Sequence, residues 1–407
     1  AGLPKNDFYL YQSQWVSAEK HPMVHLLPHW NWDNPELANR VMDEEGRIPV
    51  RTFSNAHSVE LIVNGESQGV KTFTKKTTAD GRTYQEGANP DELYLEWLVP
   101  YVPGKVEAIA RNEAGEVIAK DQVETAGKPA GVRLLKEEHA IAADGKDLTY
   151  ITYEIVDEAG RVVPTANNVV HFHLHGQGQI VGVDNGEQAS RERYKAQADG
   201  SWQRKAFNGK GVVIVKSTEQ AGAFTLYADS DRLQSDQVSL FTGKKDQAER
   251  TVLGVEPVRQ SAYLGEEPTL PSKVNVVYSD GKAQEEAVEW DAADYSRAGQ
   301  VRVTGHVQGR TVEALVDVIG VEQVLPVIKQ IPQGADLATV DKTVQLVFTD
   351  GRTVSYEVDQ WTLEAGQEEQ LSTPGARLKA TGLLSNGETV QATLVVAGGD
   401  VAKAKKP

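Results

Sequence analysis

The stretch Val59-Glu60-Leu61-Ile62-Val63-Asn64-Gly65 decides the fold class. Its residues 59, 61 and 63 form one apolar face, because side chains alternate between the two faces of a β-strand. The stretch ends at Asn-Gly, a dipeptide that strongly favours a two-residue hairpin turn. We therefore predict two antiparallel strands that join at Asn64-Gly65.

The pattern of a short β-rich run followed by a turn dipeptide recurs along the chain. The further turns are Asp80-Gly81, Asp144-Gly145, Asn185-Gly186, Asn208-Gly209, Asp280-Gly281, Asp350-Gly351 and Asn386-Gly387. This spacing is typical of all-β sandwiches, and no alternation of strands with helices competes with it. Helical spacing is confined to Asp7 to Trp15, where Phe8, Tyr11 and Trp15 share one face.

A repeat occupies the last third of the chain. The run Val276-Val277-Tyr278-Ser279-Asp280-Gly281 parallels Leu346-Val347-Phe348-Thr349-Asp350-Gly351, and a tryptophan follows each run, at Trp290 and Trp361. The stretch from Gly309 to Val312 likewise parallels that from Gly387 to Val390. We predict two related immunoglobulin-like domains here, each with its tryptophan in the core.

Composition limits the possible functions. A chain of 407 residues suggests two to four domains, and no apolar run approaches the roughly 20 residues that cross a bilayer. The net charge of −16, without a basic stripe, argues against nucleic acid as a partner. The absence of cysteine excludes disulfides and thiolate metal sites. Because the chain starts at Ala1 without a signal sequence, we expect its natural start to lie elsewhere.

Several segments resemble the part of glycoside hydrolase family 2 β-galactosidases that follows the catalytic barrel. Residues 2–15 resemble the segment after the last barrel strand, and His25-Leu26-Leu27-Pro28-His29-Trp30-Asn31-Trp32 resembles the sandwich behind it. Residues 143–148, 157–164, 182–186 and 205–209 are similar to the next domain of those enzymes. Residues beyond about 240 resemble immunoglobulin-like modules of large surface β-galactosidases of Gram-positive bacteria.

The resemblance implies an all-β chain of serial immunoglobulin-like β-sandwiches, preceded by a short remnant helix of a (β/α)8 barrel. The implied segments are residues 1–22 (the barrel helix), 23–128 and 129–243 (sandwiches, the second invasin-like), 244–322 and 323–400 (bacterial immunoglobulin-like repeats) and 401–407 (a linker). Tyr9, Tyr11 and Trp15 would dock the first sandwich against the barrel.

The resemblance also implies a role without catalysis. Retaining hydrolysis needs two carboxylates about 5 to 5.5 Å apart, which lie in the barrel of this family, so we assign no catalytic residue. The implied partners are the N-terminal catalytic barrel, in the same or a cleaved chain, and a galactoside substrate bound by the parent enzyme. The implied location is secreted or at the cell surface. A carbohydrate-binding module region and a surface adhesin remain alternatives.

Two clusters are candidates for a metal, although no cofactor is expected. Strand alternation places His171, His173 and His175 on one face, as a zinc or nickel site needs, but same-face neighbours lie about 7 Å apart and a solvated outer face explains them as well. Asp184 and Asn185 offer oxygens to a structural cation at a domain joint, although Asp-Asn-Gly is also ordinary turn chemistry.

Two tryptophans are candidates for sugar binding. Trp30 and Trp32 follow Pro28 and precede Pro35, so the strand pattern does not settle whether they are buried. Exposed indoles would stack on the apolar faces of galactose rings, and buried ones would form core.

Overall fold

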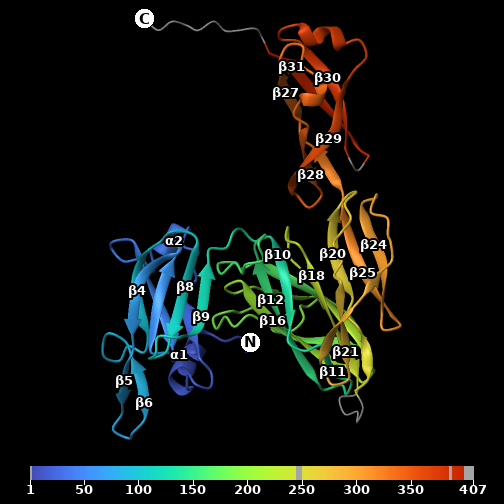
Figure 1. Cartoon of the computed structure of the whole chain (residues 1–407). Coiled ribbons are helices and arrows are strands. Elements are labelled where there is room, and N and C mark those ends of the chain that lie inside the picture. The colour runs from blue at the N-terminus through green and yellow to red at the C-terminus, as the bar shows by residue number, and fades with distance from the viewer. Residues whose placement is uncertain (1, 244–249, 385–386, 398–407) are drawn as a thin grey trace, which may run out of the picture. The chain divides into compact units, whose positions relative to one another are not determined.

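The computed structural model describes residues 2–243, 250–384 and 387–397 (Figure 1). This part of the chain is almost entirely β-structure, which confirms the predicted fold class. It forms two compact units, residues 1–251 with 278–282 and residues 252–277 with 283–407, and each is described by itself. The predicted linker 401–407 lies outside the described residues. No helix in the described part has the length and apolar character that a bilayer crossing requires.

The first unit begins with helix α1 (Asn6–Trp15) and a sandwich of two sheets. One sheet has the order β1 (Val24–Leu27), β2 (Arg47–Ser54), β7 (Leu95–Pro100), and the other the order β4 (Glu66–Thr72), β3 (Ser58–Val63), β8 (Lys105–Arg111), β9 (Val117–Glu124). Helix α2 (Pro35–Ala38) lies between β1 and β2, and β5 (Thr74–Thr77) and β6 (Thr83–Glu86) form a separate hairpin.

The predicted first hairpin is present as β3 and β4. Asn64 and Gly65 have φ values of 50° and 86°, the left-handed conformation that a tight hairpin turn requires at both positions. Val59 and Leu61 are fully buried. They pair with the neighbouring strand β8 of the same sheet, whose residues alternate between buried and half-buried. The alternation in the sequence therefore produces the core of this sandwich directly.

The second sandwich packs a sheet of four strands against one of five. The first has the order β10 (Gly131–Lys136), β12 (Leu148–Val156), β16 (Lys210–Ser217), β14 (Gly178–Asp184). The second has the order β11 (Ala140–Ala142), β18 (Asp236–Gly243), β17 (Gly222–Asp229), β13 (Val169–Gly176), β15 (Trp202–Lys205). Tyr153, Phe172 and Phe224 are buried between the sheets.

The second unit contains the predicted repeat. Its first part pairs β19 (Val252–Val255), β21 (Lys273–Tyr278), β22 (Ala283–Ala287) and, in another sheet, β20 (Val258–Tyr263), β25 (Arg310–Ile319), β24 (Gly299–Val307), β23 (Glu289–Trp290). Its second part has the order β26 (Val321–Val324), β28 (Thr343–Phe348), β29 (Thr353–Leu363), β30 (Arg377–Leu384), β31 (Thr389–Val396), β27 (Val327–Ile331), with short helices η1 (Leu337–Thr339) and η2 (Glu368–Ser372).

The two repeat tryptophans share their strand register and their hydrogen bond. Trp290 lies opposite Gly305 in the strand register, and Trp361 lies opposite Gly382. The indole N–H donates to a backbone oxygen 19 or 20 residues earlier, at distances of 2.8 and 3.0 Å. Trp361 is buried in the core of the second part of the unit. Trp290 is partly buried and packs against the separate core of the first part. Gly305 leaves room for the Trp290 ring, whereas Gly382 leaves room for Val358, so Trp361 is a core residue and Trp290 packs at the edge of its core.

Candidate functional site

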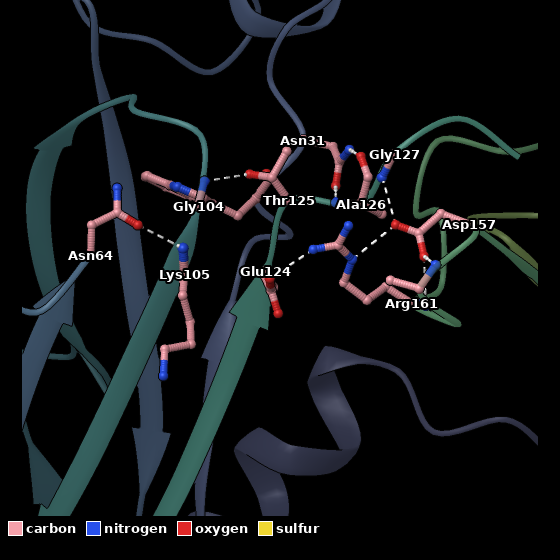
Figure 2. A network of polar contacts seen from close by, with 12 residues as sticks. Asn31, Asn64, Gly104, Lys105, Glu124, Thr125, Ala126, Gly127, Asp157 and Arg161 are labelled. Atoms are coloured by element: carbon pink, nitrogen blue, oxygen red, sulfur yellow. Dashed lines mark hydrogen bonds and ion pairs between the residues drawn. The ribbon is translucent and has the colours of Figure 1, made fainter. Parts of the chain in front are cut away.

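A network of polar contacts lies where the chain passes from β9 into β10 (Figure 2). The side-chain amide of Asn31 binds both polar groups of Ala126: its Oδ1 accepts from the Ala126 N–H at 3.0 Å, and its Nδ2 donates to the Ala126 carbonyl at 2.7 Å. The methyl group of Ala126 lies in the core of the second sandwich. Asn31 belongs to the first sandwich, so this pair joins the two sandwiches.

The tryptophans beside Asn31 hold its segment in place. Trp30 and Trp32 are 1% and 7% exposed and belong to the core of the first sandwich. The Trp30 indole donates to the Val102 carbonyl at 2.8 Å, and the Thr125 hydroxyl donates to the Trp30 carbonyl at 2.6 Å. Both rings therefore pack against protein and present no open face on which a sugar stacks. The side chain of Asn31, which lies between them, is directed at Ala126 in the connection between β9 and β10.

An ion-paired carboxylate holds the connection from the side of the second sandwich. Asp157 Oδ2 accepts from the Gly127 N–H at 2.7 Å and from Arg161 Nε at 2.8 Å, while Arg161 Nη1 donates to Glu124 Oε1 at 2.7 Å. The Asp157 side chain is only 2% exposed. Burial by itself would raise the pKa of Asp157, but the backbone N–H groups of Gly127 and Arg161 and the Arg161 guanidinium lower it below its usual value.

A glycine allows close approach at the end of the joint. The Gly104 N–H donates to the Thr125 hydroxyl at 3.0 Å, and Asn64 Oδ1 accepts from the Lys105 N–H at 2.8 Å. Gly104 has a φ of +139°, and a Cβ built there would lie 2.0 Å from Asn64 Oδ1. The network of Figure 2 thus reaches from the first hairpin turn to the second sandwich.

Two buried carboxylates of this unit, those of Asp157 and Glu154, have pKa values below their usual range. Asp157 and Glu154 are both buried. Burial would raise the pKa of Glu154, yet Lys210 and Arg133 beside it lower that pKa. A general acid at neutral pH needs a raised pKa. Asp157 and Glu154 are therefore unsuited to act as general acids at neutral pH.

Helix α1 is seated on the first sandwich through one aromatic stack. The Tyr9 ring lies parallel to the His25 imidazole, with centroids 3.7 Å apart and an interplanar angle of 14°. His25 Nε2 also lies 3.2 Å from Asn6 Oδ1, and its Nδ1 lies 3.7 Å from Asp121 Oδ2. Burial lowers the pKa of His25, and Asp121 counteracts this lowering in part.

The other face of α1 is aromatic and open. Phe8, Tyr11 and Trp15 are 54%, 53% and 77% exposed, and the Tyr11 and Trp15 rings stack with centroids 4.8 Å apart. These residues share one side of the helix, as the sequence spacing predicted. The end of α1 adjoins the β5–β6 hairpin, because the Gln85 N–H donates to Gln14 Oε1 at 2.9 Å.

Of the three β13 histidines proposed as metal ligands, His173 and His175 contact side chains of the neighbouring strand β17. His173 Nε2 lies 3.3 Å from Asp229 Oδ1, and His175 makes an edge-to-face contact with Tyr227 at 5.7 Å. His171 is half-buried, whereas His173 and His175 are exposed. Within the described ranges, no three His, Asp or Glu side chains are grouped so as to hold a metal ion.

The turn proposed as a cation site faces a guanidinium. Asp184 Oδ1 accepts from the N–H groups of Asn185 and Gly186 at 2.7 and 3.2 Å. Arg204 Nη2 donates to Asn185 Oδ1 at 2.9 Å and lies 3.5 Å from Asp184 Oδ1, and its side chain is fully buried. The positive charge beside these oxygens is thus that of the Arg204 guanidinium.

Sequence reasoning overlooked Asn31, Asp157 and Arg204. Asn31 lies between two tryptophans, but residues 28–33 form no strand, so strand alternation does not predict where its side chain points. No local signal marks Arg204 either, because its partners come from a different strand and loop.

Family models match three parts of the chain. Residues 132–239 match glycoside hydrolase family 2 C-terminal domain 5, residues 45–119 match a domain of unknown function (DUF4982), and residues 255–310 match the bacterial Ig-like domain, group 4. The second and third matches cover parts of the first sandwich and of the first repeat.

Curated and solved relatives each match part of the chain. The β-galactosidase BoGH2A of Bacteroides ovatus is 40% identical over 235 residues, which are 58% of this chain and 24% of that protein. A putative β-glucuronidase of Formosa agariphila is 33% identical over 190 residues, 46% of this chain and 16% of that protein. A β-glycosidase structure from Bacteroides vulgatus is 32% identical, with a TM-score of 0.48, and covers 59% of this chain and 27% of that one.

The matched part is thus about a quarter or less of these curated relatives' length. Residues 132–239 thus match a C-terminal domain of glycoside hydrolase family 2, the chain is similar in sequence to a β-galactosidase and a putative β-glucuronidase, and residues 255–310 match a bacterial Ig-like domain.

Proposed function

We propose that this chain is the non-catalytic C-terminal accessory region of a family 2 β-galactosidase, whose catalytic barrel is a separate part of the parent protein. The open aromatic face of α1 carries this proposal. The helix is held on the first sandwich by the Tyr9–His25 stack, while Phe8, Tyr11 and Trp15 remain exposed on its other side. Contiguous exposed apolar side chains mark contact surfaces in soluble proteins.

The joint supplies the mechanical part of this function. Asn31 and Asp157 hold the connection between the first two sandwiches from opposite sides. A domain that binds α1 would thereby be held in a fixed position relative to the second sandwich as well as the first. The first sandwich would buttress the catalytic barrel, and the later domains would act as spacers.

The choice of β-galactosidase rests on the relatives. BoGH2A, named a β-galactosidase, is 40% identical to this chain, compared with 33% for the putative β-glucuronidase. The parent would hydrolyse, and also transfer, terminal β-galactosyl residues with retention. An extracellular location is supported by the resemblance of the last domains to modules of surface β-galactosidases. A Gram-positive source stays a prediction.

The first test is hydrolysis of chromogenic β-galactosides and β-glucuronides by the purified chain. We expect no turnover of either substrate, because the resemblance places both catalytic carboxylates in the barrel and not in this chain. Sustained turnover by a preparation whose mass shows the chain alone would contradict the accessory role.

The second test addresses the contact surface. The catalytic part of the parent polypeptide is produced separately, and its binding to this chain is measured by co-purification. We expect Trp15→Ala to reduce binding, whereas Val70→Ala, at a position 57% exposed on β4, leaves it unchanged. Equal binding by both variants would remove α1 from the interface.

A further inference from the structure

His29 lies two residues before Asn31, the residue whose side chain joins the first two sandwiches. Its Nδ1 accepts a hydrogen bond from the Asn31 backbone N–H at 3.2 Å. Its ring is stacked on the Trp32 indole, with centroids 4.4 Å apart and an interplanar angle of 21°. His29 is half-buried, and Trp32 belongs to the core of the first sandwich. The imidazole is therefore held against the segment that carries Asn31.

The hydrogen bond to His29 specifies a protonation state. An imidazole nitrogen accepts a hydrogen bond only when it carries no proton, so His29 is neutral in this arrangement and its proton is on Nε2. Protonation of Nδ1 would replace the acceptor by a second N–H donor that faces the Asn31 N–H. The hydrogen bond would then be lost, and the Asn31 backbone would have to separate from the ring.

The surroundings of His29 favour its neutral form. The titratable side chains of the adjoining segments are those of Asp33, Tyr101, Glu124, Lys128, Asp157 and Arg161. Within the described part of the chain, none of them forms an ion pair with His29. Burial lowers the pKa of His29 below its usual value of about 6.5, and no charge among the described residues counteracts this lowering. The neutral imidazole is thus the form that the folded chain stabilises.

A displacement of Asn31 would act directly on the connection between β9 and β10. The residue that donates its backbone N–H to His29 also binds both polar groups of Ala126 through its side-chain amide, at 3.0 and 2.7 Å. The short side chain of Asn31 keeps both contacts only while its backbone stays in place. We propose that His29 is an acid-sensitive switch, whose protonation releases Asn31 from Ala126 and loosens the connection between the first two sandwiches.

The direction of the pH dependence follows from the neutral form of His29. Its stabilising contribution is fully present above the unfolded pKa of about 6.5 and is lost as pH falls from there through the lower folded pKa. Asp157, at the same connection, has a folded pKa below its usual value of about 4, so it stays charged in mild acid. A change at the connection between pH 7.5 and 5.0 therefore reports on His29 and not on Asp157.

The test is hydrogen exchange of residues 124–131 in the whole chain at pH 7.5 and 5.0, corrected for intrinsic rates. We expect exchange in the unmodified chain to be about two- to tenfold faster at pH 5.0, as the loss of one hydrogen bond implies. His29→Asn keeps an acceptor oxygen near the position of Nδ1 and does not titrate, so exchange should stay slow at both pH values. His29→Phe keeps a ring on Trp32 but has no acceptor, so exchange should be fast at both.

The matched control is His21→Asn. His21 is exposed and precedes β1, so this variant should respond to pH as the unmodified chain does. The proposal is overturned if exchange of the unmodified chain does not accelerate at pH 5.0, or if His29→Asn and His21→Asn respond equally. Exchange in His29→Phe that is as slow as in the unmodified chain at pH 7.5 would also overturn it. The test needs no catalytic partner, so its outcome is independent of the proposed enzyme function.

Discussion

Asn31 and Ala126, 95 residues apart, exchange two hydrogen bonds of 3.0 and 2.7 Å between a side-chain amide and a peptide unit. The Asn31 amide thus satisfies both the N–H and the carbonyl group of Ala126, as a neighbouring β-strand would. Trp30 and Trp32, the residues on either side of Asn31, are both buried in the core of the first sandwich. The first two sandwiches are therefore joined by hydrogen bonds from a side chain to the backbone, in addition to the chain itself.

Asn31→Ala should loosen this joint. The change leaves the N–H and carbonyl of Ala126 without their partner, at a cost of about 1–3 kcal/mol in local stability. Hydrogen exchange of residues 124–131 should accelerate in the variant. Asn89→Ala, at an exposed loop position, is the control and should leave that exchange unchanged. Unaltered exchange in Asn31→Ala would mean that other contacts suffice.

Gly104→Ala should destabilise the first sandwich strongly. The new Cβ would lie 2.0 Å from Asn64 Oδ1, and the φ of +139° disfavours any side chain. The cost is about 1–3 kcal/mol for the backbone alone, and moving the exposed Asn64 side chain aside also breaks its hydrogen bond with the Lys105 N–H. Gly115→Ala, where φ is +83° and nothing lies within 4 Å, isolates the backbone contribution. Thermal unfolding of the two variants should therefore differ, with Gly104→Ala less stable.

Asp157→Asn should weaken the joint in a manner that depends on pH. The folded pKa of Asp157 is lowered below the ordinary value of about 4, so its charge stabilises the folded state above that pH. This stabilisation is lost as pH falls through the folded pKa. Urea unfolding should show a lower midpoint for the variant at pH 7 and a smaller difference at pH 3. A difference that is constant with pH would exclude the charge as the cause.

His25 should make the seating of α1 sensitive to acid. Burial lowers its pKa below about 6.5, so the neutral imidazole is favoured beneath Tyr9 and beside Asn6, Phe53 and Asp121. This contribution is present above the unfolded pKa and is lost as pH falls through the folded one. Hydrogen exchange of residues 6–15, corrected for intrinsic rates, should increase between pH 7.5 and 5.5.

Two variants test this assignment to His25. His25→Phe keeps an aromatic ring beneath Tyr9 and carries no proton, so it should suppress the response to acid. His57→Gln, at an exposed position, should behave like the unmodified chain. An undiminished response in His25→Phe would place the titrating group elsewhere.

The all-β fold, the hairpin at Asn64-Gly65 and helix α1 follow from the sequence itself. Alternation along a strand and the left-handed conformation of Asn-Gly are properties of adjacent residues, so they can be recognised without knowledge of distant contacts. The two repeat tryptophans also follow, because the same local pattern recurs around each. The domain boundaries inferred from the resemblance stay predictions.

Only the tertiary structure decided which polar side chains act together. Trp30 and Trp32 are core residues because two sheets close over them, and Asn31 meets a peptide 95 positions away for the same reason. Arg204 is beside Asp184 and Asn185 because strand β15 passes below their turn. Contacts of this kind depend on how segments that are distant in the sequence pack together, and local sequence patterns do not determine that packing.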